Sequence, residues 1–95
     1  MILENAIEQS QEAGNELLDL NDTIWEDEMD EIVAEMKERN ILEFTISNTS
    51  TGLLETLNAF EVRGAKIICM AKVNSPYKNF STGERKKLNA IKLSF

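Results

Sequence analysis

The chain changes character close to residue 40, both in the spacing of its apolar residues and in the sign of its charge. Before this point, apolar residues recur every three or four positions, which is typical of helices that bury one face. After it, Leu42, Phe44 and Ile46 alternate with polar residues, which predicts a strand with one buried face. Residues 1–40 carry thirteen Asp and Glu against two bases, whereas residues 41–95 carry four acids against eight bases. We therefore expect an acidic helical part followed by a basic part that contains strands.

The N-terminal part predicts two helices. The first covers residues 2–18, and its pattern leaves open whether Gly14 ends it early and a second short helix follows. The next begins near Thr23, because Thr23 and Glu26 have the spacing of a capping box, and it ends with Asn40 in a left-handed conformation. The large apolar side chains that we expect in the core rather than in an interface are Trp25, Met29, Met36 and Met70.

The C-terminal part predicts a βαββ unit. A helix over residues 53–60 follows the first strand and ends at Gly64. Residues 65–73 are apolar on both faces, which is typical of a central strand that is covered on each side. A turn at residues 81–84 then leads into a closing strand over residues 88–95, and Pro76 is expected to end safe pairing of the strand before it.

The predicted fold class is α+β, with two N-terminal acidic helices followed by a βαββ unit that forms a small three-stranded mixed sheet. A right-handed crossover would make the first two strands parallel, and the hairpin would add the third antiparallel. The crossover helix is then expected on one face of the sheet and the acidic helices near the other. A chain of 95 residues predicts a single domain, with an acidic helical part at 1–40 and a βαββ part at 41–95.

The composition argues against an enzyme, a metalloprotein and a membrane protein. The chain has no histidine, the commonest general base and transition-metal ligand, and no motif supplies a base for Ser50, Thr51 or Cys69. Cys69 is the only cysteine, so we expect a small buried thiol in a reducing cytoplasm. No apolar run approaches the roughly 20 residues that span a bilayer, and Glu4 and Glu8 stand where a secretory signal would carry bases. We expect no cofactor, no metal and no catalytic residue.

Acidic residues of the two N-terminal helices form the first candidate binding surface. Along the first helix they recur at every fourth position and form a tilted anionic row. Two interpretations stay open: a solvated face that maintains solubility, and a surface that binds a basic partner, much as the phosphates of a nucleic acid do. The acids at 27–31 lack the ligand spacing and glycine of a calcium loop. The candidate partner-binding residues are Glu4, Glu8, Glu12, Glu16, Glu26, Asp27, Glu28, Asp30, Glu31 and Glu35.

Basic residues of the last hairpin form the second candidate surface. They stand near Tyr77 and Phe80, and aromatic and cationic side chains together can stack bases and bind phosphates. The net charge of −7 opposes approach to a polyanion, so we favour internal pairing with the acidic helices or a solvated edge over direct nucleic-acid binding. The candidate nucleic-acid-binding residues are Lys78, Arg85, Lys86 and Lys87.

From residue 41 to the C-terminus, the chain resembles a family of small uncharacterised proteins from phages and mobile elements of bacteria. The resemblance is carried by turn and cap residues, namely Ser50-Thr51-Gly52-Leu53-Leu54, Ala59-Phe60-Glu61, Gly64, Lys72-Val73-Asn74-Ser75-Pro76-Tyr77 and Thr82-Gly83-Glu84-Arg85. It implies no catalytic residue and leaves the acidic N-terminal part outside. An acidic extension on such a module is similar in construction to anti-CRISPR proteins, small phage-borne inhibitors that occupy the cationic channel of an RNA-guided nuclease.

The principal hypothesis is a stoichiometric inhibitor of an RNA-guided CRISPR nuclease in the cytoplasm of a bacterial host. The carboxylates of both N-terminal helices would compete for the guide or DNA surface of the nuclease, without turnover. One alternative is a nucleic-acid-associated module that uses the basic hairpin. The other is a homo-oligomerisation module, for example a homodimer, in which the acidic helices of one chain pair with another chain.

Overall fold

The computed structural model of the protein describes residues 2–22, 24–47 and 52–95. Within these ranges the chain forms three α-helices, one short 3-10 helix and four strands. In chain order they are α1 (Ile2–Glu12), β1 (Leu18–Leu20), η1 (Glu26–Glu28), α2 (Met29–Glu38), β2 (Glu43–Ile46), α3 (Leu53–Glu61), β3 (Lys66–Lys78) and β4 (Arg85–Ser94). The α+β class predicted from the sequence is confirmed.

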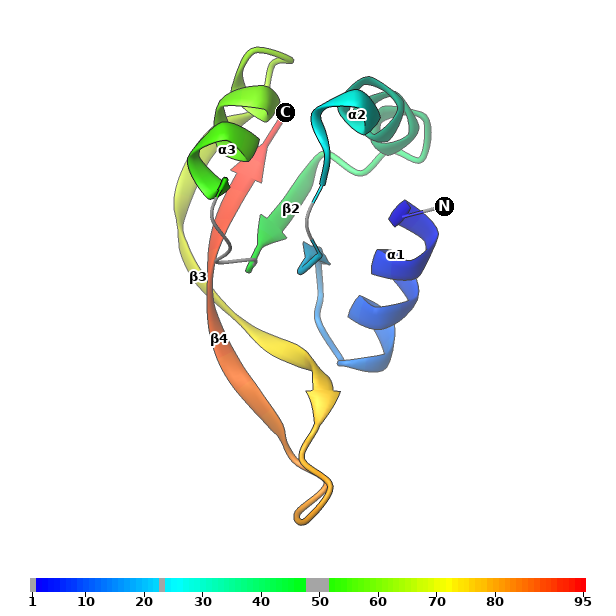
Figure 1. The fold of residues 1–95 in the computed structure, drawn as a ribbon, viewed down its shortest axis with the longest axis vertical. Helices are drawn as coiled ribbons and strands as arrows, with labels where there is room; N and C mark the ends of the chain where they lie inside the picture. Colours follow the sequence, from blue (N-terminus) through cyan, green and yellow to red (C-terminus); the bar gives the residue numbers. More distant parts are fainter. Residues whose placement is uncertain (1, 23, 48–51) are drawn as a thin grey trace.

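The four strands in the described ranges form one mixed sheet in the order β1-β2-β4-β3 (Figure 1). β1 pairs parallel with β2, and β4 pairs antiparallel with both β2 and β3. β2 and β3 therefore run in the same direction, as a right-handed crossover requires, but β4 lies between them. The predicted three-stranded sheet is wrong in two respects: it lacked β1, and it placed residues 65–73 in the centre although β3 is an edge strand.

β1 exists because α1 ends earlier than the longest predicted helix. Gly14 has a φ of +78°, and its N–H donates to the carbonyl of Gln11, while the N–H of Asn15 donates to the carbonyl of Ser10. These two bonds form a Schellman motif, which closes a helix with a left-handed residue. The alternative in which Gly14 ends the helix is thus correct, but a strand follows where a second short helix was expected.

The ends of the other two helices agree with the prediction. Asn40 has a φ of +62° after α2, and Gly64 has a φ of +103° after α3. The next N–H in each case, from Ile41 and Ala65, returns to the last turn of its helix. Thr23, the predicted start of the second helix, lies outside the described residues, and the helical segment begins at Glu26 in η1.

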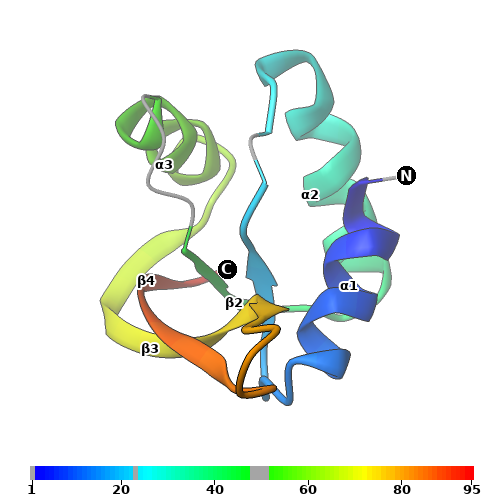
Figure 2. The ribbon, with the colours of Figure 1, turned by 60° about the horizontal axis from the view of Figure 1, so that its bottom comes forward.

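The core lies between the sheet and the helices, with α2 and α3 on the same face of the sheet (Figure 2) and with Leu3 and Ala6 of α1 in the same cluster. An ion pair of 2.8 Å between Asp30 of α2 and Arg63 joins the two helical segments. Phe44 of β2 stacks against Phe60 of α3, with ring centroids 4.8 Å apart. The expectation that the acidic helices lie opposite the crossover helix is therefore wrong for α2. Its buried face of Met29, Ile32, Val33 and Met36 joins the same core as Phe60.

Several apolar residues that we expected inside are on the surface, among them Leu42, Ile67 and Ile68. Trp25 is 65% exposed at the start of η1, and Met70 is 67% exposed on β3. Cys69, predicted to be buried, is also exposed. Met29 and Met36 are buried as expected. The first five residues of β3, Lys66 to Met70, are all exposed, so this part of the strand is not covered on both faces as the prediction required.

The β3–β4 hairpin reaches beyond the rest of the molecule, at the bottom of Figure 1. The molecule measures 41 Å along its longest axis and only 24 and 22 Å along the others. The two strands are longer than predicted and continue past Pro76, although their register is interrupted between Asn74 and Lys78. The turn that joins them is closed by hydrogen bonds between the backbones of Asn79, Gly83 and Glu84.

Candidate interaction surfaces

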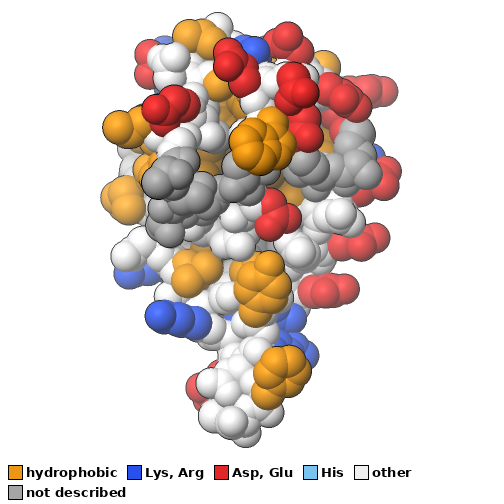
Figure 3. Space-filling view, in the orientation of Figure 1, with side chains coloured by type: hydrophobic (Ala, Val, Ile, Leu, Met, Phe, Trp, Pro, Cys, Tyr) orange, Lys and Arg blue, Asp and Glu red, His pale blue; other side chains and the backbone are white. Residues whose placement is uncertain are grey.

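Eight of the ten candidate acids are exposed, and the other two, Glu28 and Glu35, are partly buried. The predicted row along the first helix is shorter than expected, because Glu16 lies in the turn that follows α1 and not on the helix. The positions are Glu4, Glu8 and Glu12 on α1, Glu16 in the turn, Glu26, Asp27 and Glu28 on η1, and Asp30, Glu31 and Glu35 on α2. In Figure 3 the Asp and Glu side chains gather mainly over the upper and right-hand parts of this face.

Few of these acids are neutralised by the chain itself. In the described part of the chain, three of the ten form ion pairs: Glu4 and Glu35 with Arg39, and Asp30 with Arg63. Arg39 directly follows α2 and Arg63 stands two residues after α3, so neither arginine belongs to the hairpin. Glu26, Asp27 and Glu31 are exposed and take part in none of the ion pairs among the described residues.

The four basic candidates lie together at the outer end of the hairpin, Lys78 at the end of β3 and the other three at the start of β4. The predicted internal pairing with the acidic helices is not observed among the described residues, where the ion pairs involve Arg39, Arg63 and Lys92. Arg85 is partly buried, and its guanidinium donates to the carbonyl of Ser75 across the hairpin. Lys78, Lys86 and Lys87 are exposed.

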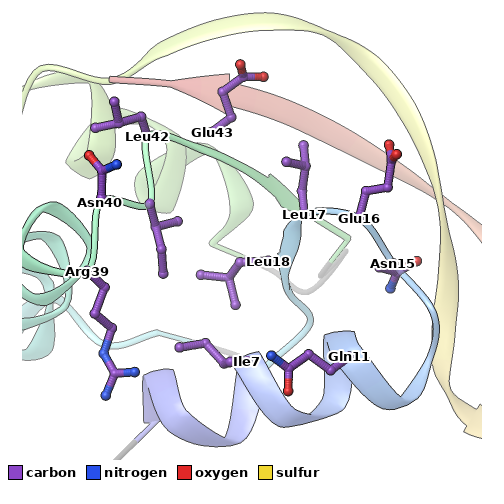
Figure 4. Close-up of a pocket in the computed structure, with 11 residues that line it drawn as sticks. Ile7, Gln11, Asn15, Glu16, Leu17, Leu18, Arg39, Asn40, Leu42 and Glu43 are labelled. Atoms are coloured by element: carbon purple, nitrogen blue, oxygen red, sulfur yellow. The ribbon is translucent and has the colours of Figure 1, made fainter.

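A groove of about 550 Å³ lies between α1, the turn after it and the connection from α2 to β2 (Figure 4). Ile7 of α1 and Leu18 of β1 point into it, and Leu42 lines the far side. Its lining also includes the charged residues Glu16, Arg39 and Glu43. A groove that combines apolar residues with a few charged groups suits an apolar side chain of a partner better than a polar metabolite.

A second hollow of about 390 Å³ separates η1 and α2 from α3. Trp25 and Met29 line one side, and Ala59 and Val62 line the other. Trp25 and Val62 are largely exposed at the mouth, so the hollow places an aromatic side chain directly beside the acids of η1. Sequence reasoning missed this arrangement because the helical period placed Trp25 on the buried face.

Asp19 was treated in the sequence as one acid of the charged N-terminal part, but it is buried in β1. Its carboxylate accepts hydrogen bonds from the hydroxyls of Thr45 at 2.7 Å and Ser47 at 2.6 Å. Asn21 donates to the same Ser47 hydroxyl at 2.8 Å. Burial raises the pKa of Asp19, and the two hydroxyl donors lower it in part. The three residues of β1 are too few to show an alternating pattern, so the sequence carries no clear signal for the burial of Asp19.

The residues considered for catalysis and metal binding are not assembled into a site in the described ranges. Ser50 and Thr51 lie outside those ranges, and Cys69 is exposed on an edge strand. No group of three or more Cys, Asp and Glu residues in the described part of the chain is arranged to hold a metal ion. In that same part, every helix is too short or too polar to cross a bilayer.

The model of one protein family, described as a domain of unknown function, DUF7698, matches residues 3–95. The chain belongs to this family. The match agrees with the resemblance to an uncharacterised family and corrects its extent, because the acidic residues of α1, η1 and α2 lie inside the DUF7698 domain. No curated protein and no solved structure matches the chain.

Proposed function

We propose that this DUF7698 protein binds a basic surface of another macromolecule and acts without turnover. The exposure of Trp25 carries the proposal. Trp25 is 65% exposed, stands next to the exposed acids Glu26 and Asp27, and borders the hollow between α2 and α3. Aromatic side chains of this kind are enriched in protein interfaces, where they supply much of the binding free energy.

The charges around Trp25 indicate which kind of partner surface it would bind. Glu26, Asp27 and Glu31 are exposed and take part in none of the ion pairs among the described residues. Acids fixed on helical segments attract a surface rich in Lys and Arg, and they accelerate its association at low salt. The groove beside α1 adds a second place where an apolar side chain of the partner fits, with Glu16 in its lining.

Proteins that hold nucleic acid present such a surface, because they place Lys and Arg at the spacing of phosphates. The partner class that we favour is an RNA-guided CRISPR nuclease of a bacterial host. The support for this choice is the small size, the net charge of −7 and the resemblance of residues 41–95 to proteins of phages and mobile elements. In this proposal the protein is a stoichiometric anti-CRISPR inhibitor in the cytoplasm.

The test is inhibition of DNA cleavage by a panel of RNA-guided nucleases, with affinities measured for any nuclease that is inhibited. The double variant Asp27→Lys, Glu31→Lys and the single variant Trp25→Ala should each weaken inhibition by about tenfold or more. The matched control is Glu61→Lys, Glu84→Lys, which changes the net charge equally at exposed positions outside the acidic helices. Equal losses in both double variants would reject the electrostatic site, and no inhibition by the wild type would reject the nuclease as target.

The outer hairpin favours a second candidate function, binding of single-stranded nucleic acid. Tyr77 and Phe80 are exposed beside Lys78, Lys86 and Lys87, and stacking on aromatic residues together with phosphate contacts is how such modules bind. Retention on heparin or single-stranded DNA at low salt that is lost in Lys86→Glu, Lys87→Glu would support this function. Retention that does not change in this variant would reject it.

A further inference from the structure

The sheet has two outer edges, formed by β1 and β3. At each edge, a polar side chain bonds to the backbone of the strand in the place of a neighbouring strand. At the β1 edge, the hydroxyl of Ser10 on α1 accepts a hydrogen bond from the backbone N–H of Asp19 at 2.9 Å. β1 is three residues long, and α1 lies beside it (Figure 1). This edge is therefore covered by α1.

At the β3 edge, a polar side chain also bonds to the strand backbone, at the single residue Asn74. The carboxamide of Asn15 accepts from the backbone N–H of Asn74 at 2.8 Å and donates to its carbonyl at 3.1 Å, which reproduces the pairing of a strand. The side chain of Asn74 in turn donates to the carbonyl of Ala13 at 2.8 Å. The turn after α1 thus closes the edge at Asn74.

The stretch of β3 from Lys66 to Lys72 has no such cover among the described residues, where β4 is its neighbour on one side and no strand pairs on the other. Outward and inward backbone groups alternate along an antiparallel ladder. Since Asn74 directs its N–H and carbonyl away from β4, Met70 and Lys72 direct theirs the same way, because the register is unbroken from Cys69 to Asn74. These groups are free to pair with an added strand.

The side chains along this stretch are apolar and exposed. Ile67 and Ile68 are each 54% exposed, Met70 is 67% exposed, and Cys69 between them is exposed as well. Proteins usually protect an edge strand with charges, a bulge or a covering element. Here a register shift between Ile67 and Cys69 is present, yet four consecutive apolar side chains still face solvent.

We propose that the open edge of β3 binds an extended segment of a partner protein by strand addition, and that this segment has apolar residues in its centre and carboxylates on both sides. The positive charge along the β3 edge is the reason why we expect carboxylates in the partner segment. Lys66 and Lys72 flank the apolar stretch, are exposed, and take part in none of the ion pairs of the described residues. From Lys66 to Ser94 the hairpin carries seven Lys and Arg against Glu84 alone. Main-chain pairing provides affinity in such complexes, and the side chains provide specificity.

A second copy of the chain fits this edge less well. A two-fold antiparallel pairing centred on Cys69 would place Lys66 of each copy opposite Lys72 of the other, and like charges directly opposite each other destabilise a sheet. Each copy also carries a net charge of −7, which adds repulsion over the whole molecule. This surface is separate from the acidic segments of α1, η1 and α2, so the inference does not depend on the function proposed for them.

The experiment uses two fluorescein-labelled seven-residue peptides with the same Val-Ile-Val centre, one flanked by two Glu on each side and one by two Lys. Fluorescence anisotropy with the full-length protein should show binding of the Glu-flanked peptide with a Kd below about 1 mM. The Lys-flanked peptide should bind about tenfold more weakly or not at all. On binding, the amide protons of Met70 and Lys72 should become protected from hydrogen exchange, while that of Asn74 is unchanged.

The variant Ile68→Glu, Met70→Glu should abolish binding of the Glu-flanked peptide while circular dichroism shows a retained fold. The matched control Tyr77→Glu, Phe80→Glu introduces the same charges at exposed apolar positions outside the open edge and should bind like the wild type. Equal binding of the two peptides, or loss of binding in both variants, would overturn the inference. A wild-type dimer in sedimentation experiments that becomes monomeric only in Ile68→Glu, Met70→Glu would assign the edge to a second copy and would overturn it too.

Discussion

The helical body and the outer part of the β3–β4 hairpin are stabilised by different interactions. In the body, Phe44, Phe60 and Met36 are fully buried, and the core includes residues from all three helices. Beyond Asn74, the hairpin relies on backbone pairing with β4 and on its turn, while Tyr77 and Phe80 face solvent. The comparison teaches that the apolar residues of the body are needed for folding, whereas those of the outer hairpin are available for binding.

The largest effect should come from removing an aromatic side chain of the body. Phe44→Ala should lower the free energy of unfolding by about 3–5 kcal/mol, because it leaves a cavity beside Phe60 and Phe95. Phe80→Ala, which removes an equally large but fully exposed side chain, should change it by less than about 0.5 kcal/mol. Denaturant unfolding of both variants measures the contrast. Losses of similar size would show that the outer hairpin contributes to the folded state through Phe80.

A smaller effect should follow from opening the covered edge of the sheet. Ser10→Ala removes the acceptor of the buried Asp19 N–H and should cost about 1–3 kcal/mol. Ser81→Ala in the hairpin turn is the control and should be nearly neutral, since the side chain of Ser81 is exposed. Thermal or denaturant unfolding of the two variants gives the comparison. If Ser10→Ala lowered the free energy of unfolding as little as Ser81→Ala does, the hydrogen bond from the Asp19 N–H to the Ser10 hydroxyl would contribute little to stability.

The smallest effect concerns the pH dependence of stability. Burial raises the pKa of Asp19 above its ordinary value of 3.8, so the folded state holds this proton more tightly than the unfolded state does. The contribution of Asp19 to the free energy of unfolding is thus greatest below 3.8 and falls as the pH rises through the folded-state pKa. The variant Asp19→Asn does not titrate at this position. Relative to it, the free energy of unfolding of the wild type should decrease as the pH rises above 3.8 and through the folded-state pKa of Asp19.

Unfolding free energies measured in steps between about pH 3 and pH 7 test this prediction. Asp22→Asn is the control, because it makes the same substitution at an exposed position in the loop after β1. A wild type that gains stability relative to Asp19→Asn as the pH rises would mean that the hydroxyls of Thr45 and Ser47 outweigh burial.

The parts of the fold that could be predicted from the sequence are those with a local cause. The ends of α2 and α3 follow from Asn40 and Gly64, whose left-handed conformations are encoded in the residue itself. The position of β4 between β2 and β3 could not be predicted, because it depends on pairing between distant segments. β1 was missed for a related reason: three residues are too few to show a period, and its cover by Ser10 is a tertiary contact.

The candidate surfaces show the same division. The exposure of most of the acids followed from their place on predicted helices, and the structure agrees with it. Trp25 and the apolar run at Ile67 and Met70 were assigned to the core, since large apolar residues are usually buried. Their exposure depends on which elements fail to cover them, and this is decided by the whole fold. These failures of the apolar pattern now mark the two surfaces that we propose for binding.

The turn at Gly14 and Asn15 has a mechanical consequence. It ends α1, it holds the backbone of Asn74 in β3, and it is followed at once by Glu16 in the lining of the groove. The turn therefore connects α1 to the β3–β4 hairpin. A partner strand that extended along β3 as far as Asn74 would have to displace Asn15, and this displacement would also disturb the end of α1 and the acid that follows it.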